Sequence, residues 1–187
     1  MDDETTGDPS RVVIDRRRSV LESALTTFGR FGYRKASMDQ VAQDADISRP
    51  GLYFLFTSKQ DLFRAAVTQA LEHDLAEVER ALRDTSLPRR TRLVNAFDQW
   101  AGRYVGPGMR DVAVVVDNNP DLLGPITDLA PARFSELVTA ALATDEHASA
   151  AEVAQTLVST SVGLKHQVDT RAEYCARMAV AITLLTR

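Results

Sequence analysis

Two helix-start signals, at Ser37 and Ser48, lie so close together that only a short helix and a tight turn fit between them. Gln40 follows Ser37 by three residues, which is the spacing of a capping box, where each side chain accepts a hydrogen bond from the other residue's backbone. An amphipathic helix predicted at Arg16–Phe31 precedes this pair, and Gly32 can end it in left-handed backbone. Three short helices, with a tight turn between the second and the third, predict a helix-turn-helix.

The middle of the chain is also predicted to be helical. Ser58 opens a long fourth helix, and a fifth is expected at about Arg90–Val105. Apolar residues recur along the fourth helix at helical spacing: Leu71, Leu75, Val78 and Leu82. Residues Val112–Val116 are β-branched, but no second strand candidate exists to pair with them, so a helix is predicted there too.

The C-terminal third is predicted to hold three helices. Pro120, Pro125 and Pro131 divide the region before a helix at about Ala132–Leu142. Two more helices should start at capping boxes, Ser149 with Glu152 and Thr170 with Glu173. The last helix has two apolar faces, one made by Tyr174, Met178, Ile182 and Leu185 and the other by Ala176, Val180 and Leu184. Its own core can cover only one face, so the other suits a partner subunit.

These patterns predict an all-α chain with an N-terminal three-helix helix-turn-helix domain and a C-terminal helical bundle. The expected divisions are a disordered arm at 1–15, the helix-turn-helix domain at 16–63 and the second domain at 64–187.

The charge is distributed unevenly along the chain. The whole sequence carries a net charge of −4, but residues 11–64 hold ten Lys or Arg against six acids, a net +4. A basic segment attached to an acidic body is what a domain facing phosphates needs, although an ordinary solvated surface could also carry this charge.

Several classes of protein are disfavoured by what the sequence lacks. The single cysteine, Cys175, permits no internal disulfide and gives no metal-ligand spacing, so no cofactor or metal is expected. No glycine-rich phosphate loop or nucleophile elbow is present, and the three histidines have no partner at catalytic spacing, which argues against an enzyme. Apolar stretches are too short to span a membrane and the first ten residues are acidic, so a cytoplasmic protein is expected.

Three segments together resemble the DNA-binding domain of the TetR (tetracycline-repressor-like) family. They are VLESALTTFGRFGY at 20–33, SMDQVA at 37–42 and ISRPGLYFLFTSK at 47–59, followed by Leu62 and Phe63. The resemblance covers the N-terminal part of the chain; beyond it only the length and the helical layout are similar. It implies a dimeric transcription regulator whose third helix enters the major groove of DNA.

The resemblance and the helix positions give a set of candidate DNA contacts. Arg49, at the start of the third helix, is expected to reach base edges, where a bidentate arginine–guanine pair discriminates by about 1–3 kcal/mol. Thr57 and Lys59 are expected to bind phosphate near the start of the fourth helix, and Lys35 and Ser37 near the start of the second. The complete set is Lys35, Ser37, Arg49, Pro50, Gly51, Tyr53, Phe54, Thr57 and Lys59.

Several of these residues also have simpler explanations. Ser37 is accounted for by its capping role, and Gly51 allows either close approach to DNA or close packing. Tyr53 would be half core and half phosphate donor, whereas Phe54 either touches a thymine methyl or is simply an exposed aromatic. Arg16–Arg18 either follow the DNA backbone or form a solvated basic run.

The sequence departs from the family pattern at three positions. Asp46 stands where the family usually has glycine in the turn, but aspartate tolerates left-handed backbone, so the turn should survive. Leu55 replaces a more common histidine or tyrosine and would remove one phosphate contact. Thr57 replaces a frequent proline or lysine, and its hydroxyl can still donate.

For the C-terminal domain, the resemblance implies a homodimer through the last two helices and a small-molecule effector that releases DNA. The candidate pocket residues are Phe97, Trp100, Tyr104, Met109, Asp117, Phe134 and His166, and they are mostly large and apolar. Their composition favours an apolar or aromatic effector. The small run at 159–163 would either allow close helix approach or line the pocket.

Three interpretations of function remain open at this point. The first is a ligand-released repressor on a palindromic operator. The second is a ligand-independent regulator or an activator. The third is an architectural DNA-binding protein, for which affinity would not depend on base sequence.

Overall fold

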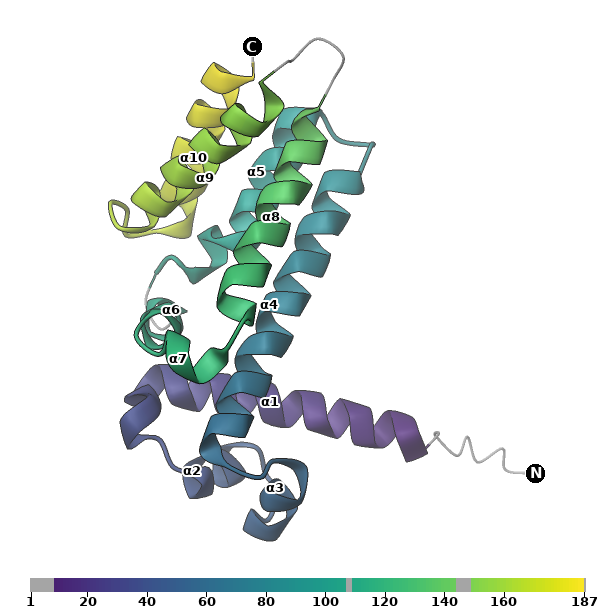
Figure 1. The fold of residues 1–187 in the computed structure, drawn as a ribbon, viewed down its shortest axis with the longest axis vertical. Helices are drawn as coiled ribbons and strands as arrows, with labels where there is room; N and C mark the ends of the chain where they lie inside the picture. Colours follow the sequence, from purple (N-terminus) through teal and green to yellow (C-terminus); the bar gives the residue numbers. More distant parts are fainter. Residues whose placement is uncertain (1–8, 107–108, 144–148, 187) are drawn as a thin grey trace, which may run out of the picture.

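The computed structural model describes residues 9–106, 109–143 and 149–186, and this described part is built from helices without any strand. The elements in chain order are α1 (Pro9–Lys35), α2 (Met38–Asp44), α3 (Arg49–Leu55), α4 (Lys59–Arg83), α5 (Arg89–Trp100), the 3₁₀ turn η1 (Gly102–Tyr104), α6 (Met109–Asp117), α7 (Pro120–Leu123), α8 (Ile126–Leu142), α9 (Ala150–Lys165) and α10 (Arg171–Leu185). Figure 1 shows α2 and α3 at one end of an elongated molecule, with α4 leading from them into the bundle. The all-α prediction is confirmed.

The predicted capping residues fix the starts of α2, α3 and α4. The Ser37–Gln40 capping box is complete, with both reciprocal hydrogen bonds formed. Ser48 accepts from the N–H of Gly51, and Ser58 accepts from the N–H of Asp61. Each hydroxyl satisfies a donor that the first helical turn would otherwise leave unpaired, so three successive starts are determined locally.

The first helix is longer at both ends than predicted. It begins at Pro9, so residues 9–15, expected to be a disordered arm, are helical; residues 1–8 lie outside the described part. Proline is favoured in the first helical turn because it has no N–H to satisfy there. Gly32, with φ 74° and ψ 155°, interrupts the helix at a kink as its positive φ allows, and a further helical segment follows to Lys35.

Two C-terminal predictions were wrong in detail. Pro131 lies inside α8, which begins at Ile126. The proline removes one backbone hydrogen bond but does not end the helix. Ser149 precedes α9 but makes no side-chain cap, since its φ of −118° and ψ of 24° are not the extended geometry that capping requires. The helix predicted around Val112–Val116 is confirmed as α6, whereas the fifth helix ends at Trp100 and continues as η1.

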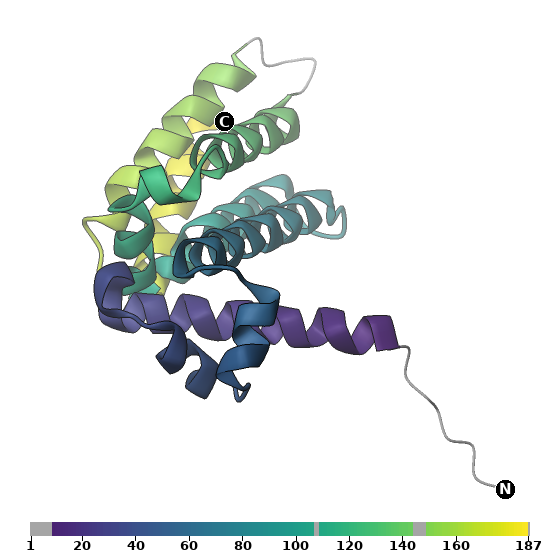
Figure 2. The ribbon, with the colours of Figure 1, turned by 60° about the horizontal axis from the view of Figure 1, so that its bottom comes forward.

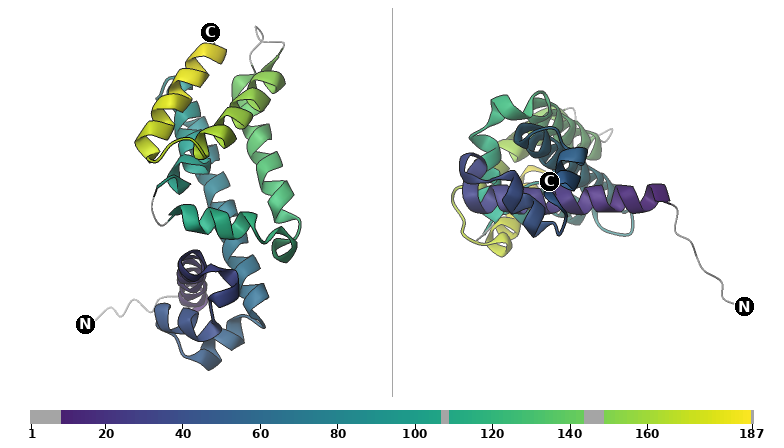
Figure 3. Two further views of the ribbon diagram at one scale, coloured as in Figure 1. Left: turned by 90° about the vertical axis from the view of Figure 1, so that its left-hand side faces the viewer. Right: turned by 90° about the horizontal axis from the view of Figure 1, so that it is seen from below.

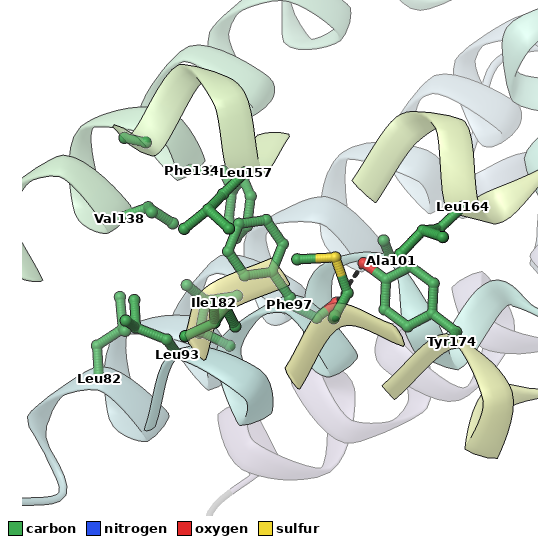
Figure 4. Close-up of a cluster of buried hydrophobic side chains, with 14 of the residues drawn as sticks. Leu82, Leu93, Phe97, Ala101, Phe134, Val138, Leu157, Leu164, Tyr174 and Ile182 are labelled. Atoms are coloured by element: carbon green, nitrogen blue, oxygen red, sulfur yellow. Dashed lines mark hydrogen bonds between the residues drawn. The ribbon is translucent and has the colours of Figure 1, made fainter. Parts of the chain in front are cut away.

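Buried side chains form two separate clusters. The first joins α1, α2, α3 and the start of α4, and includes Phe28, Val41, Leu52 and Phe63. The second joins the far part of α4 with α5, α8, α9 and α10, and it contains Phe97, Phe134 and Tyr174 among the residues drawn in Figure 4. Helix α4 contributes several buried side chains to each cluster, so it links the two ends of the molecule, as Figure 3 also shows.

The segment α6–α7 packs against the N-terminal cluster although it follows α5 in sequence. Leu123 is fully buried in that cluster, and Val115, Val116, Leu122 and Ile126 pack around it. The Nε of Arg64 on α4 donates to the backbone oxygen of Leu122 at 3.1 Å. The helix-turn-helix end therefore rests on α6–α7 as well as on α4.

Candidate nucleic-acid interface and ligand cavity

The start of α3 is exposed at the end of the molecule. Arg49 and Pro50 occupy the first turn, and the proline needs no hydrogen-bond acceptor there. Gly51 donates its backbone N–H to the Ser48 hydroxyl at 3.2 Å, and a Cβ at position 51 would lie 3.1 Å from that oxygen. Glycine at this position thus keeps the cap unstrained. Close approach of Gly51 to DNA stays a prediction.

The turn and α1 hold α2 and α3 in place. Asp46 has a φ of 51°, so aspartate does occupy the left-handed position where the family usually has glycine. Thr27 of α1 donates its hydroxyl to the Asp44 carboxylate at 2.7 Å, which joins α1 to the end of α2. Leu52 of α3 is fully buried in the first cluster and anchors the helix there. Figure 2 shows α2 and α3 side by side beneath α1.

The outward face of α3 carries one cation and two aromatic rings. The Nε of Arg49 lies 3.0 Å from Oδ1 of Asp39 on α2, and both side chains are well exposed. The Arg49 guanidinium also lies 5.8 Å from the centre of the Tyr53 ring. Tyr53 is 44% exposed and Phe54 is 90% exposed. A 90% exposed phenylalanine adds little to the core, which fits both a contact to a thymine methyl and a simple exposed aromatic.

Lys59, at the start of α4, is bound to the end of α1. Its ammonium donates to the backbone oxygens of Arg34 at 3.3 Å and Ala36 at 3.2 Å, and lies 4.7 Å from the centre of the Tyr33 ring. A cation is favoured at a helix C-terminus because the last carbonyl groups carry partial negative charge. The sequence reasoning missed this structural contact. A phosphate contact by Lys59 would use the same ammonium group that binds these two carbonyl oxygens.

The remaining predicted phosphate contacts differ in how free they are. The Thr57 hydroxyl and backbone N–H both donate to Oδ2 of Asp61, at 3.2 and 2.9 Å, so the hydroxyl is already in use. Ser37 is engaged in its capping box with Gln40. Lys35 is exposed at the end of α1, and within the described ranges it makes no ion pair. Leu55 is half-buried against the first cluster.

The basic run at 16–18 lies on an exposed part of α1. Its middle member, Arg17, has its guanidinium 5.0 Å from the centre of the buried Phe56 ring. A cation over an aromatic face gives this residue a packing role, whatever else it contacts.

A cavity of about 410 Å³ lies between the two clusters, within the size range of small-molecule sites. Four of the predicted pocket residues line it: Trp100, Tyr104, Asp117 and Phe134. Trp100 and Phe134 stack with their ring centres 4.8 Å apart. Phe97 is buried in the second cluster and does not line the cavity, nor does the exposed His166. The side chain of Met109 lies outside the described part.

The sequence reasoning missed much of the cavity wall. Helix α9 contributes Val158, Ser161, Val162 and Lys165, which recur at helical spacing. The small run at 159–163 was the available signal, and it does supply Ser161 and Val162. Further apolar wall residues come from α1, α4 and α6: Leu25, Val67, Ala70, Leu71, Val112 and Val116.

A buried polar cluster borders the cavity. Asp74 of α4 is 1% exposed and accepts hydrogen bonds from the Arg103 guanidinium and the Tyr104 hydroxyl, both on η1. Burial raises the pKa of the Asp74 carboxyl, because it disfavours the charged form. The hydrogen-bond donors and nearby cations lower this pKa, but by less than burial raises it. Burial likewise raises the pKa of Tyr104. The Tyr104 hydroxyl is therefore a donor already committed to α4.

The N-terminal part of the chain is similar in sequence to known proteins. Residues 20–66 match the family described as bacterial regulatory proteins, tetR family. The relatives include the transcriptional regulator RutR of Escherichia coli strain K12, 36% identical over 84 residues, which are 45% of this chain and 39% of RutR. The transcriptional activator FasR of Mycolicibacterium smegmatis is 36% identical over 86 residues, which are 46% of this chain and 39% of FasR.

A solved structure extends the similarity along the chain. A putative transcriptional regulator from Saccharomonospora viridis, in complex with choline, superposes with a TM-score of 0.72 at 22% identity, over 91% of this chain and 96% of that one. This structural likeness shows the fold. The sequence match places a TetR-family DNA-binding domain at residues 20–66 of this chain.

The similarity in sequence covers only part of this chain and of its relatives. The aligned part spans about two fifths of the curated relatives' length, and the structural likeness shows the fold alone. The relatives are named as transcriptional regulators, in agreement with the prediction that the chain is not an enzyme. In the described part of the chain no helix is long and apolar enough to cross a membrane.

Proposed function

We propose that this protein is a sequence-specific DNA-binding transcription regulator that acts as a dimer and releases a palindromic operator when a small molecule binds. The observation that carries the proposal is the start of α3, where Arg49 is exposed on a short, capped helix at one end of the molecule. A helix of this kind fits the major groove with its leading residues at the base edges. The domain division near residue 63 is part of the same proposal.

The division of roles at the interface follows from the geometry. Arg49 and Phe54 are the base-reading candidates, because they are exposed on α3 and their outer atoms have no core function. Lys35, Ser37, Thr57, Lys59 and Tyr53 are proposed to contact phosphates and so to set position rather than sequence preference.

Dimerisation is proposed through α9 and α10. Val162 of α9 is 55% exposed, and on α10 Val180 and Leu184 are 60% and 57% exposed. The opposite face of α10 is filled by Tyr174, Met178 and Ile182, which are fully buried. An apolar face that its own core leaves open is what a symmetric dimer interface requires. Two copies joined this way would present two α3 helices about 34–36 Å apart, or a multiple of that distance.

The proposed effector site is the 410 Å³ cavity. Its wall is mainly apolar, with the stacked Trp100 and Phe134 rings, and this supports an effector with an apolar or aromatic body. Asp117 and Lys165 also line it, and no other described group pairs with either of them. They are candidates to fix a polar end of the effector. The choline found in the S. viridis protein shows that a related fold holds a small organic molecule.

A route from the cavity to DNA is proposed through α6. Val112 lines the cavity and also touches α1: a Cβ built on Gly29 would lie 2.5 Å from Cγ2 of Val112. Because α1 supports α2 and α3, an effector that displaces Val112 would shift the reading end. The effector must prefer the shifted form, typically by about 5–150-fold in affinity.

Two experiments test the proposal. Selection from a random duplex library with the full chain should enrich an inverted repeat, with half-site centres about one helical turn or a multiple apart. An architectural protein would enrich no sequence, and this result would overturn the proposal.

A thermal-shift screen of small apolar and aromatic compounds should then find ligands that also weaken operator binding. Val158→Trp, which fills the cavity, is the matched control and should abolish the shift while operator binding remains. FasR is an activator, so a reporter assay in cells has to decide the sign of regulation.

A further inference from the structure

Asp39 lies beside the proposed base-reading arginine and has no other described partner. It occupies the second position of α2, and its carboxylate contacts Arg49 on α3 across the helix-turn-helix. Both side chains are about 60% exposed, at 60% for Asp39 and 63% for Arg49. An ion pair this exposed adds little to stability, because water screens it. An acidic side chain in the first turn also stabilises α2, but this role does not require a contact with Arg49.

The geometry of the contact leaves the reading edge of Arg49 free. Oδ1 of Asp39 forms an ion pair with Nε at 3.0 Å, and the two terminal Nη groups form no hydrogen bond with a described residue. Those terminal groups are the ones that can pair with O6 and N7 of a guanine. The Tyr53 ring, 5.8 Å from the guanidinium, borders the same group from within α3. A guanidinium plane is rigid, so fixing Nε also restricts where the free edge points.

We infer that Asp39 is a positioning residue, which orients the Arg49 guanidinium for base recognition and thereby sharpens sequence preference. The inference rests on the proposed function. The Asp39 carboxylate has an electrostatic cost: one negative charge near the phosphates lowers the affinity for every duplex alike. The benefit is that Arg49 is ordered before DNA arrives, so less conformational freedom is lost when the base pair forms.

The test combines Asp39→Asn with selection from a random duplex library, using the full chain. Asp39→Asn should keep the same motif but lower the preference at the guanine read by Arg49 by about tenfold, within the range that a bidentate pair provides. Affinity for duplexes without the motif should stay the same or rise. Asp39→Glu, which restores a carboxylate, should recover part of the preference.

Asp46→Asn is the matched control for charge. It removes one negative charge from the same helix-turn-helix, and Asp46 makes no ion pair with Arg49. Asparagine also tolerates the left-handed backbone at this position. It should raise affinity for all duplexes without changing the preference. If Asp39→Asn behaved in the same way, its carboxylate would be only a repelling charge and the inference would be wrong.

A double-mutant cycle separates positioning from direct reading. In the Arg49→Ala background, Asp39→Asn should leave the base preference unchanged, because the group that Asp39 orients is gone. A preference that still changed there would mean that Asp39 contacts a base itself, and this too would overturn the inference. If the wild-type chain enriched no motif at all, the proposed function would fail and the inference with it. Equal melting temperatures would show that the variants fold.

Discussion

At the scale of single residues, the interface shows side chains that combine a structural and a DNA-facing role. Lys59 was expected at a phosphate, and the structure places its ammonium on two carbonyl oxygens at the end of α1. Lys35 lies at the end of the same helix and has no such contact within the described part. The two lysines therefore allow the structural and the electrostatic contributions to be separated.

We predict that Lys35→Ala and Lys59→Ala will each weaken binding to all duplexes to a similar degree, and each will reduce the slope of log affinity against log salt by about 1. Only Lys59→Ala should also lower the free energy of unfolding, by about 0.5–2 kcal/mol, because only Lys59 binds the helix end. Salt-dependent fluorescence anisotropy and urea unfolding measure the two effects. Equal stability of both variants would contradict the assignment of Lys59.

The buried carboxylate of Asp74 gives a second residue-scale prediction. Asp74→Ala should lower the free energy of unfolding by about 3–5 kcal/mol, since it leaves Arg103 and Tyr104 without their shared acceptor in a largely buried position. Tyr104→Phe should cost less, because Arg103 keeps its partner. The order of the two variants in chemical denaturation checks this, and a reversed order would contradict it.

At the scale of elements, local sequence signals predicted most helix starts correctly but gave little information about contacts between distant helices. The caps at Ser37, Ser48 and Ser58 were predictable, because a hydroxyl bonding to an N–H three residues later involves only neighbours in sequence. The start of α1 was missed even though Asp8 followed by Pro9 is a recognised helix-start pattern. At Ser149 the side chain was suitable but the backbone took another geometry, which no local pattern reveals.

The cavity illustrates the same limit. Trp100, Tyr104 and Phe134 were predictable because large residues on bundle helices have to pack somewhere. The contribution of α9 and the contact between α6 and α1 depend on how helices far apart in the chain cross. Spacing within one helix carries no information about that crossing.

The contact between α1 and α6 gives an element-scale prediction. Gly29→Ala should lower the free energy of unfolding by about 1–3 kcal/mol, because the new methyl group would overlap Cγ2 of Val112. Adding Val112→Ala removes the overlapping methyl group and should restore part of the loss, which is a coupling that two independent sites would not show. Urea unfolding of the single and double variants measures it. Additive losses would mean that the two helices do not meet there.

At the scale of the whole molecule, the proposal requires two copies. Val180→Asp combined with Leu184→Asp should give a monomer in analytical ultracentrifugation. It should also reduce operator affinity, because a single helix-turn-helix domain makes only half of the DNA contacts. Leu129→Asp is the control: Leu129 is 62% exposed but lies on α8, which is not part of the proposed interface, so this variant should remain a dimer. A dimer that survived the double substitution would move the interface elsewhere.

The central claim is that the exposed start of α3 reads base sequence. It is tested most directly by measuring the affinity of wild-type protein and Arg49→Ala for the selected operator and for each of its single-base variants. We predict that wild type ranks these duplexes over a wide range of affinity, and that Arg49→Ala flattens the ranking at the guanine contacted by Arg49, by about 1–3 kcal/mol. An unchanged ranking in Arg49→Ala would contradict the account.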